Sequence, residues 1–493
     1  MPPAEMKKWR GDDFPSWLSP MVVKELRQGV QSGAFAWTFI GLQAAMFLLI
    51  SWGLTFFEPG SRGPGQEMFG FFFWLIVSVG VLLILPLRGL GAISSERVGN
   101  NLDLVRLTRL SATRIVLGKW LAIVAQSALL VAAILPYLVL RYFFGGVNVV
   151  RDLEVIGWLF AGSMVVTAGA LALSTLPLWV RIAAGALAMP PAIGFFIRFI
   201  ESGGTVSFGR NERLAGLALL VLYTVVLLEY TASRIAPLAE NHALRKRTIA
   251  LLIGFAWLAI GARAPQPWVA VAMVALLPLV LTYAVESLLE RPVHLPSQAA
   301  ALARFSLPGR LAARLLTPGW ATGLVFVFTL ALPCAACAWM CAWRFGTERE
   351  RLAVAAFVPL FLATVLFPLP AVVWLPRVRY RLLLYAFVQL LCFMVFIYTN
   401  AMKPPGLAWK DWTLGCQLMR PLPLASLASL MASNGSEEVA RACLPWSGIM
   451  IATVCLAVAK PWLREMRETS CVLAAARAGR SARAASVRAG ALA

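Results

Sequence analysis

The chain has 493 residues, of which 60% are apolar and only 14% are charged, and its mean hydropathy is +0.77. Soluble domains carry about 25% charged residues, so this composition excludes a soluble globular enzyme, a disordered chain and a fibre. The net charge of +21 is explained by the Lys and Arg excess of cytoplasmic loops and by anionic lipid headgroups, and we expect no nucleic-acid binding. The sequence therefore predicts an all-α membrane protein.

Apolar stretches of about 20 residues, long enough to cross a bilayer, recur about twelve times along the chain. They cover roughly residues 35–57, 68–87, 119–140, 155–178, 182–200, 214–233, 248–262, 267–288, 320–343, 352–375, 380–400 and 443–461. An even number of spans places both termini on one side, and most of the 44 Lys and Arg residues then fall on that side. The positive-inside rule assigns it to the cytoplasm. We expect no cleaved signal peptide, because residues 1–16 contain no apolar stretch before a small-residue cleavage site.

A cytoplasmic lead-in, residues 1–34, precedes the first span. Within it, Pro20 to Gln31 has the spacing of an amphipathic helix. Apolar and charged residues alternate between two faces of this helix, which contains Val22, Val23, Lys24, Glu25, Leu26 and Arg27. We predict an interfacial helix that lies on the membrane surface before span one. The alternative is an ordinary solvated leader.

Behind the lead-in, the sequence divides into four further parts. Residues 35–235 form a six-span core, and residues 236–319 form a two-span hairpin followed by a basic, amphipathic cytoplasmic segment. Residues 320–463 form a four-span C-terminal module, and residues 464–493 form a loose, basic cytoplasmic tail. The connection 401–441 is unusually long for an outer loop.

Residues that could carry out chemistry are few. Asp152 and Glu154 are the best acidic pair, and the sequence contains no Ser-His-Asp set or HExxH motif in a plausible frame. Glu229, Glu286 and Arg198 lie near the ends of their predicted spans, where a long side chain reaches the interface. We therefore expect no catalytic residue in this chain.

The cysteines give two further expectations. Cys334, Cys337 and Cys341 form one stripe at helical spacing inside an apolar span, with no His or acid nearby. Small residues at such spacing are usually a packing surface, so we expect no metal site. Cys416 and Cys443 lie in or beside the long outer loop, and whether they pair stays open, because pairing depends on an oxidising compartment.

The loop between spans two and three, residues 88–118, is the most distinctive segment. Asn100 can cap a short helix over 101–109, and Asp103 completes a pair similar to a capping box. Ser111 can cap the next helix, which leads into span three. A short, partly apolar helix outside the membrane is typical of docking to a soluble partner. The alternative is a plain connector whose leucines face the membrane.

This loop resembles the signature of the type-2 ATP-binding-cassette (ABC-2) permeases. The matching residues are Glu96, Arg97, Leu102, Asp103, Leu104, Leu107, Thr108, Leu110, Ser111, Ile115, Val116, Gly118 and Lys119. The lead-in Ser19-Pro20-Met21-Val22-Val23-Lys24-Glu25-Leu26-Arg27 is similar to the interfacial helix of that family. The resemblance covers residues 19–235. Asn100, Asn101 and Arg109 depart from the family pattern, and the six spans that follow are additional.

The resemblance implies a transmembrane permease subunit of an ATP-driven exporter in a bacterial-type inner membrane. Such a chain binds a separate ATPase subunit, pairs with a second permease copy or paralogue, and contacts membrane lipids. The ATPase contact would be made by Leu102, Asp103, Leu104, Val105, Arg106, Leu107 and Thr108, flanked by Glu96 and Arg97. No Walker A motif occurs in this sequence, so we expect no enzyme activity and no cofactor here. ATP and Mg²⁺ would bind the partner.

Two other function classes remain open. One is a twelve-span secondary transporter, although the two halves differ in loop lengths and no ion-coupling acids are evident within the predicted spans. The other is a non-transporting membrane scaffold or enzyme. The sequence does not indicate a substrate for any of the three classes.

Overall fold

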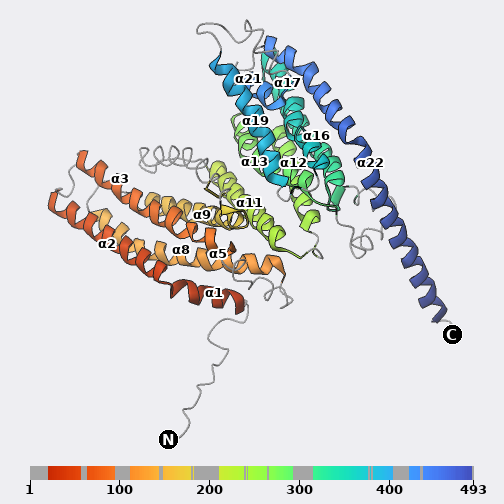
Figure 1. Cartoon of the computed structure of the whole chain (residues 1–493). Helices are drawn as coiled ribbons and strands as arrows, with labels where there is room; N and C mark the ends of the chain where they lie inside the picture. The colour runs from red at the N-terminus through yellow and green to blue at the C-terminus, as the bar shows by residue number, and fades with distance from the viewer. Residues whose placement is uncertain are drawn as a thin grey trace. The chain divides into compact units, whose positions relative to one another are not determined.

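The structure is a computed structural model that contains only helices and their connections among the residues it describes (Figure 1). These are residues 20–56, 64–94, 111–143, 148–178, 181–182, 210–237, 240, 242–263, 266–292, 312, 315–375, 378, 381–402, 421–432 and 437–490. Nine helices in this part of the chain are long and apolar enough to cross a membrane. The protein is therefore a multi-pass membrane protein. Its chain divides into unit 1, Met1–Pro237, and unit 2, Leu238–Ala493.

Unit 1 begins with a short helix and continues with five stretches of membrane-spanning length. Its elements are α1 (Pro20–Val30), α2 (Gly33–Phe56), α3 (Pro64–Ser78), η2 (Val79–Ile84), α4 (Leu85–Leu87), α5 (Gly89–Ala92), α8 (Ala112–Phe143), α9 (Val149–Ser174) and α11 (Arg210–Ile235). Elements α3 to α5 together form the second span, and η2 is a π-helical stretch within it.

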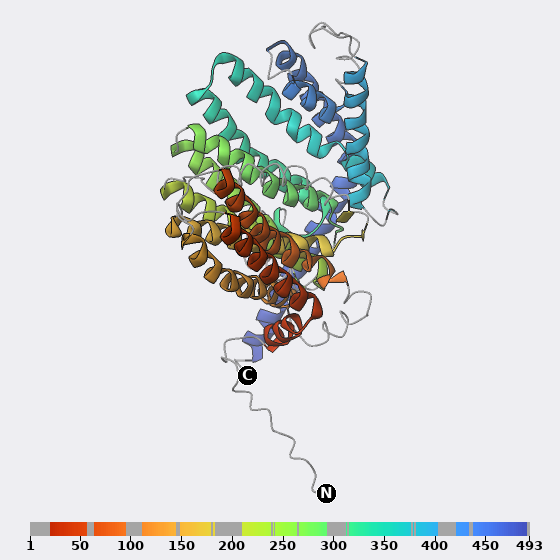
Figure 2. The same cartoon turned by 90° about the vertical axis from the view of Figure 1, so that its left-hand side faces the viewer.

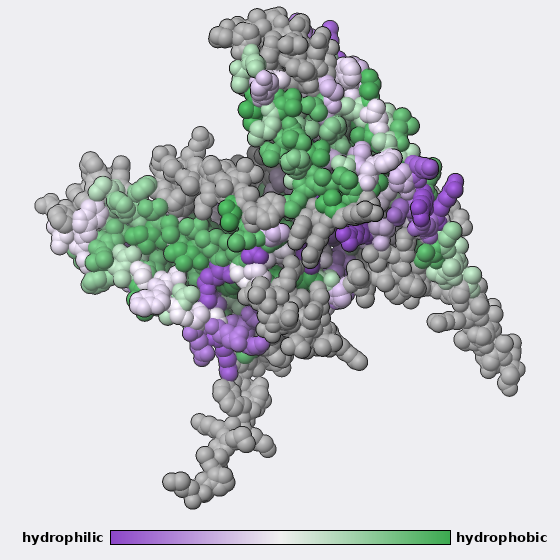
Figure 3. All heavy atoms as spheres, viewed as in Figure 1, coloured by the Kyte–Doolittle hydropathy of each residue, from purple (hydrophilic) through white to green (hydrophobic). Residues whose placement is uncertain are grey.

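The core of unit 1 lies between α2, α3, α8 and α9. Met46, Phe73, Leu130 and Ile134 are completely buried there. Large apolar side chains also cover the outside of these helices, as the space-filling view shows (Figure 3). An apolar exterior of this kind faces lipid rather than water.

Unit 2 contains eight helices among its described residues. They are α12 (His242–Arg263), α13 (Gln266–Leu289), α16 (Trp320–Phe345), α17 (Glu348–Leu366), α18 (Leu369–Trp374), α19 (Arg381–Ala401), α21 (Pro423–Ala432) and α22 (Glu437–Gly490). Helix α17 begins with a capping box, in which the Thr347 side chain accepts from the Glu350 backbone and Glu350 accepts from the Thr347 backbone. This pair satisfies two amide groups that the first turn leaves without partners.

A close approach of two backbones joins α13 to α16. A Cβ added to Gly323 would lie 2.6 Å from the carbonyl carbon of Ser287 and would overlap its oxygen. Gly319, one turn earlier, has a φ of +145° and begins α16. Small residues such as Gly323 are typical of places where helices approach closely in membranes.

Nine of the predicted spans correspond to the nine apolar helices. Helices α12 and α13 form over the predicted spans 248–262 and 267–288, but neither is among the nine. Residues 183–200 of a further predicted span lie outside the described residues. The number twelve, the cytoplasmic position of the termini and the domain boundaries therefore stay predictions.

One expectation about the C-terminal region was wrong. The tail from residue 464 is not loose, because α22 continues without interruption to Gly490 and extends beyond the rest of unit 2 in two views (Figures 1 and 2). Its Ala- and Arg-rich sequence favours helix. The long outer loop contains helix α21, which packs against α17 and α22 through an apolar cluster that includes Cys443. Cys416 lies outside the described residues, so its pairing with Cys443 is still open.

Candidate functional site

The predicted ATPase contact, Glu96, Arg97 and 102–108, lies outside the described residues. Both ends of that loop are described. Helix α5 ends at Ala92 and is followed by Ser94, and helix α8 begins at Ala112 directly after Ser111, as the predicted cap requires. The candidate site is therefore the set of contacts that hold these two ends, which we call the loop anchor.

Helix α1 supplies the first part of the loop anchor. It packs along α8, with Val22 buried and Lys24 and Arg27 exposed. Glu25 was expected on the polar face, but it points to α8, where the Lys119 ammonium lies 3.2 Å from its carboxylate. The Lys119 side chain is only 6% exposed. A buried charge needs such a partner, so this ion pair fixes α1 to the helix that leaves the loop.

Arg88 supplies the second part, at the junction between α4 and α5. Its guanidinium donates to the Ser32 hydroxyl at 2.6 Å and to the Gln126 side chain on α8. Ser32 in turn donates to the Gly29 carbonyl at 2.6 Å, which closes the turn between α1 and α2. A Cβ added to Gly29 would overlap the side-chain amide of Gln126. Three segments far apart in the sequence thus meet at one arginine.

Arg181 supplies the third part. It donates to the Leu176 and Ser174 carbonyls at 2.8 and 2.9 Å, which lie at the end of α9. It also donates to the Leu90 carbonyl at 2.9 Å and to the Ser94 hydroxyl at 3.1 Å. Ser94 is the last described residue before the loop. Nothing in the sequence around Arg181 indicates these partners, because Leu90 is 91 residues away.

The loop anchor has the properties of a mechanical connection rather than of a catalytic centre. Arg181 holds the start of the loop to α9, and Arg88 and Lys119 hold the adjoining helices α5 and α8 to α1 and its turn. Charge-assisted hydrogen bonds of this kind are short and directional. A displacement of the loop would therefore reach α1, α8 and α9 together.

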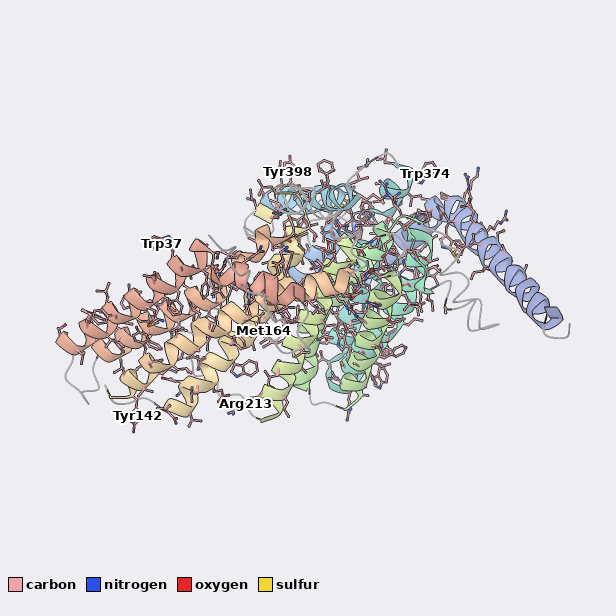
Figure 4. The ribbon with its side chains drawn as sticks, turned by 90° about the horizontal axis from the view of Figure 1, so that it is seen from below. Trp37, Tyr142, Met164, Arg213, Trp374 and Tyr398 are labelled. Carbon is pink, nitrogen blue, oxygen red and sulfur yellow. The ribbon has the colours of Figure 1, made fainter. Side chains whose placement is uncertain are left out.

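The acidic pair considered for an enzyme has a structural role in unit 1. Arg141 donates to Asp152 at 2.7 Å, and its guanidinium lies 5.0 Å from the Phe73 ring centre. Arg213 lies 3.1 Å from Glu154. Figure 4 labels Arg213 together with Tyr142, the neighbour of Arg141, at the lower edge of the view. Each acid is thus neutralised by a different arginine instead of sharing one reactive site.

A second buried cluster of charges lies in unit 2, between α12 and α13. The Lys246 ammonium lies 3.0 Å from both Glu286 and Glu290, and Arg247 lies 2.8 Å from Glu290. Burial alone would lower the pKa of Lys246, but the two carboxylates outweigh it and hold its pKa above the ordinary value. Glu286 was expected to reach the interface alone; it is instead paired inside the unit.

Arg247 also holds the chain segment that leads into α16. It donates to the carbonyls of Leu315 and Thr317 at 2.8 Å each and to the Gly319 carbonyl at 3.0 Å. A further bond of 3.0 Å goes to the Thr322 hydroxyl. One fully buried guanidinium thus satisfies several carbonyl groups that a loop would otherwise expose to lipid.

The cysteine stripe behaves as packing surface. Cys337 is completely buried and donates to the Trp257 carbonyl on α12 at 3.4 Å. Within the described part of the chain, no group of His, Cys, Asp and Glu is arranged to hold a metal ion.

Comparisons of the chain with protein-family models, with curated proteins and with solved structures each found no match.

The loop anchor leads to a first prediction. Replacing Arg88 by methionine removes charge-assisted bonds that are each worth about 1.5–3 kcal/mol. We expect the amide hydrogens of residues 22–32 to exchange at least about tenfold faster, since the turn after α1 loses its bond to Arg88 and only the Glu25–Lys119 pair of the loop anchor still holds α1. Hydrogen exchange read by mass spectrometry measures this. The control is Arg114→Met, which removes an exposed arginine near the start of α8; equal exchange in the two variants would contradict the role of Arg88.

Proposed function

We propose that the chain is the transmembrane permease subunit of an ATP-driven exporter of the ABC-2 type. In this proposal it has about twelve spans and cytoplasmic termini, resides in a bacterial-type inner membrane, and pairs with a second permease copy or paralogue. A separate ATPase subunit binds the loop between spans two and three and supplies ATP hydrolysis.

The observation that carries the proposal is the loop anchor. Binding energy at a loop changes the conformation of a membrane domain only when the loop makes different contacts in the two states and is connected to the moving helices. Arg88, Lys119 and Arg181 provide this connection: Arg88 and Lys119 lead to the amphipathic helix α1 and its turn, and Arg181 leads to α9. A plain connector between two spans needs no such bonds. The residues of the resemblance, Glu96 to Lys119, occupy the loop and its exit.

The test is an affinity pull-down of the tagged full chain from its native membranes in mild detergent, with the captured proteins identified by mass spectrometry. Wild type should capture an ATPase with a Walker A motif. The double variant Leu104→Asp, Leu107→Asp should capture it at least about tenfold less, because charged residues replace two apolar anchors of a helix-in-groove contact.

The control is a second double variant, Ser470→Asp, Cys471→Asp, which adds the same charge at exposed positions of α22. It should capture the ATPase as wild type does. Absence of any Walker A protein beside an intact and monodisperse wild-type chain would overturn the proposal, and equal capture by both double variants would remove the docking role of the loop.

A secondary transporter is the second candidate, and one observation favours it. Ion-coupled transporters place acidic residues inside the membrane domain, and Glu286 and Glu290 lie largely buried in unit 2, with side chains 14% and 15% exposed. Transport by purified chain in vesicles, driven by an imposed proton or sodium gradient without ATP, would support this candidate against the exporter.

A further inference from the structure

Unit 2 contains a cavity of about 270 Å³ between α12, α13, α16 and α17. The side chains that line it are apolar except for the Cys334 thiol and the indole N–H of Trp257. The cavity is partly open and lies among residues 257–365. It shares no residue with the loop anchor or with the buried charges around Arg247.

Small residues of α16 create the cavity. Ala331, Cys334, Ala335 and Ala338 recur at spacings of three and four residues, so they share one face of the helix and form a low floor. Helices α13 and α17 both pack against α16. Larger side chains from these two neighbours, such as Phe361, form the walls. The gap between the walls stays unfilled because the floor residues are too short to reach across it.

The chemistry of the lining excludes a polar ligand. A buried water needs two to four polar partners, and this lining offers almost none. Empty apolar cavities of about 150 Å³ already bind small hydrocarbons such as benzene, and this one is larger. Whatever occupies it is therefore apolar along its whole buried length.

The length of the cavity indicates which kind of apolar ligand it can hold. Its floor extends along α16 from Val327 to Ala338, which corresponds to a length of about 16 Å at the rise of an α-helix. A floor of this length admits an extended hydrocarbon chain. Helices α16 and α17 are both of membrane-spanning character, so lipid hydrocarbon is the medium around them.

We propose that this cavity binds a single acyl chain of a membrane lipid, which fills the slot between α13 and α17. The site does not depend on the proposed transport function. The chain enters the slot from lipid hydrocarbon, so packing contacts within the slot, rather than removal of apolar surface from water, decide whether it binds. A bulky side chain on the floor therefore has a large and measurable effect on how often an acyl chain occupies the slot.

The experiment uses the full chain in vesicles of phosphatidylethanolamine and phosphatidylglycerol that contain a phosphatidylethanolamine with a diazirine on one acyl chain. After illumination, mass spectrometry of the peptides locates the crosslinks. In wild type we expect crosslinks at Ala331, Cys334, Ala335 and Ala338. In Ala335→Phe these crosslinks should fall by about tenfold, because the ring fills the space of the acyl chain and removes its packing contacts.

The matched control is Ala336→Phe, which places the same ring on the exposed face of α16 one residue further along and should leave the crosslinks at the floor unchanged. If Ala335→Phe does not yield a monodisperse chain, Ala338→Val tests the same slot with a smaller change. Crosslinks at the floor residues that are equally abundant in Ala335→Phe and in Ala336→Phe would overturn the proposal. Labelling confined to the exposed positions Leu332 and Trp339 would also overturn it.

Discussion

Replacing Arg247 by alanine is expected to lower the free energy of unfolding of the protein by about 3–5 kcal/mol. The substitution leaves the Glu290 carboxylate without one of its two cations. It also leaves the Leu315, Thr317 and Gly319 carbonyls without their shared donor. Thermal unfolding in detergent, followed by tryptophan fluorescence, should show a midpoint lower by about 10 °C.

Two further variants separate the causes of this loss. Arg245→Ala removes an exposed arginine two residues away on α12 and should change the midpoint little. Arg247→Lys keeps the charge but loses the planar fork of donors, so we expect a loss between those of the other two. A midpoint for Arg247→Ala that matches Arg245→Ala would show that the buried arginine does not stabilise the unit.

Replacing Gly323 by alanine should be nearly as damaging, by about 3 kcal/mol. The added Cβ meets the backbone of Ser287 on α13, and not the end of a flexible side chain. A backbone cannot move aside alone, so α13 and α16 have to separate along their contact. The same unfolding measurement, or steric trapping in bicelles, gives the loss.

The control is Gly448→Ala on α22, where an added Cβ meets nothing within 4 Å. Alanine is favoured over glycine in a helix by about 1 kcal/mol. The two substitutions are chemically identical and should therefore change stability in opposite directions. A stabilising effect at Gly323 would mean that the two helices do not approach as closely as the structure shows.

The apolar spans could be predicted from the sequence because hydrocarbon sets the length of a helix that crosses it. Residues 33–56 and 149–174 form α2 and α9 close to the predicted spans 35–57 and 155–178. Helix α8 starts at Ala112, as expected for a helix capped by Ser111, and so begins before the predicted span 119–140. Its first two turns contain Arg114 and Lys119, and hydropathy alone assigns such charged turns to the loop.

The polar contacts could not be predicted in the same way. Lys246 is separated from Glu290 by 44 residues, and Arg181 from Leu90 by 91. No local periodicity relates residues so far apart, and a basic side chain beside a span is explained equally well by the positive-inside rule. The pairing of Glu25 with Lys119 was missed for this reason, since the helical pattern alone places Glu25 on the polar face.

The assignment of the ATPase contact to the loop depends on its resemblance to the ABC-2 signature. The contact residues 102–108 lie outside the described residues, so their assignment is still a prediction that only the pull-down tests. The structure adds the anchor at each end, which includes Arg88 and Arg181, two side chains that are not among the matching residues, beside Lys119 and Glu25, which are.

The length of helix α22 and the contacts at its middle determine how a tilt is transmitted along it. Its 54 residues correspond to about 80 Å of helix, more than twice the thickness of the hydrocarbon core. Two tryptophans hold its middle: the Trp374 indole donates to the Ala457 carbonyl, and the Trp462 indole donates to the Ala321 carbonyl. A rod fixed at its middle acts as a lever with its pivot there. A tilt of one half of α22 about this pivot therefore moves the other half through the same angle in the opposite direction.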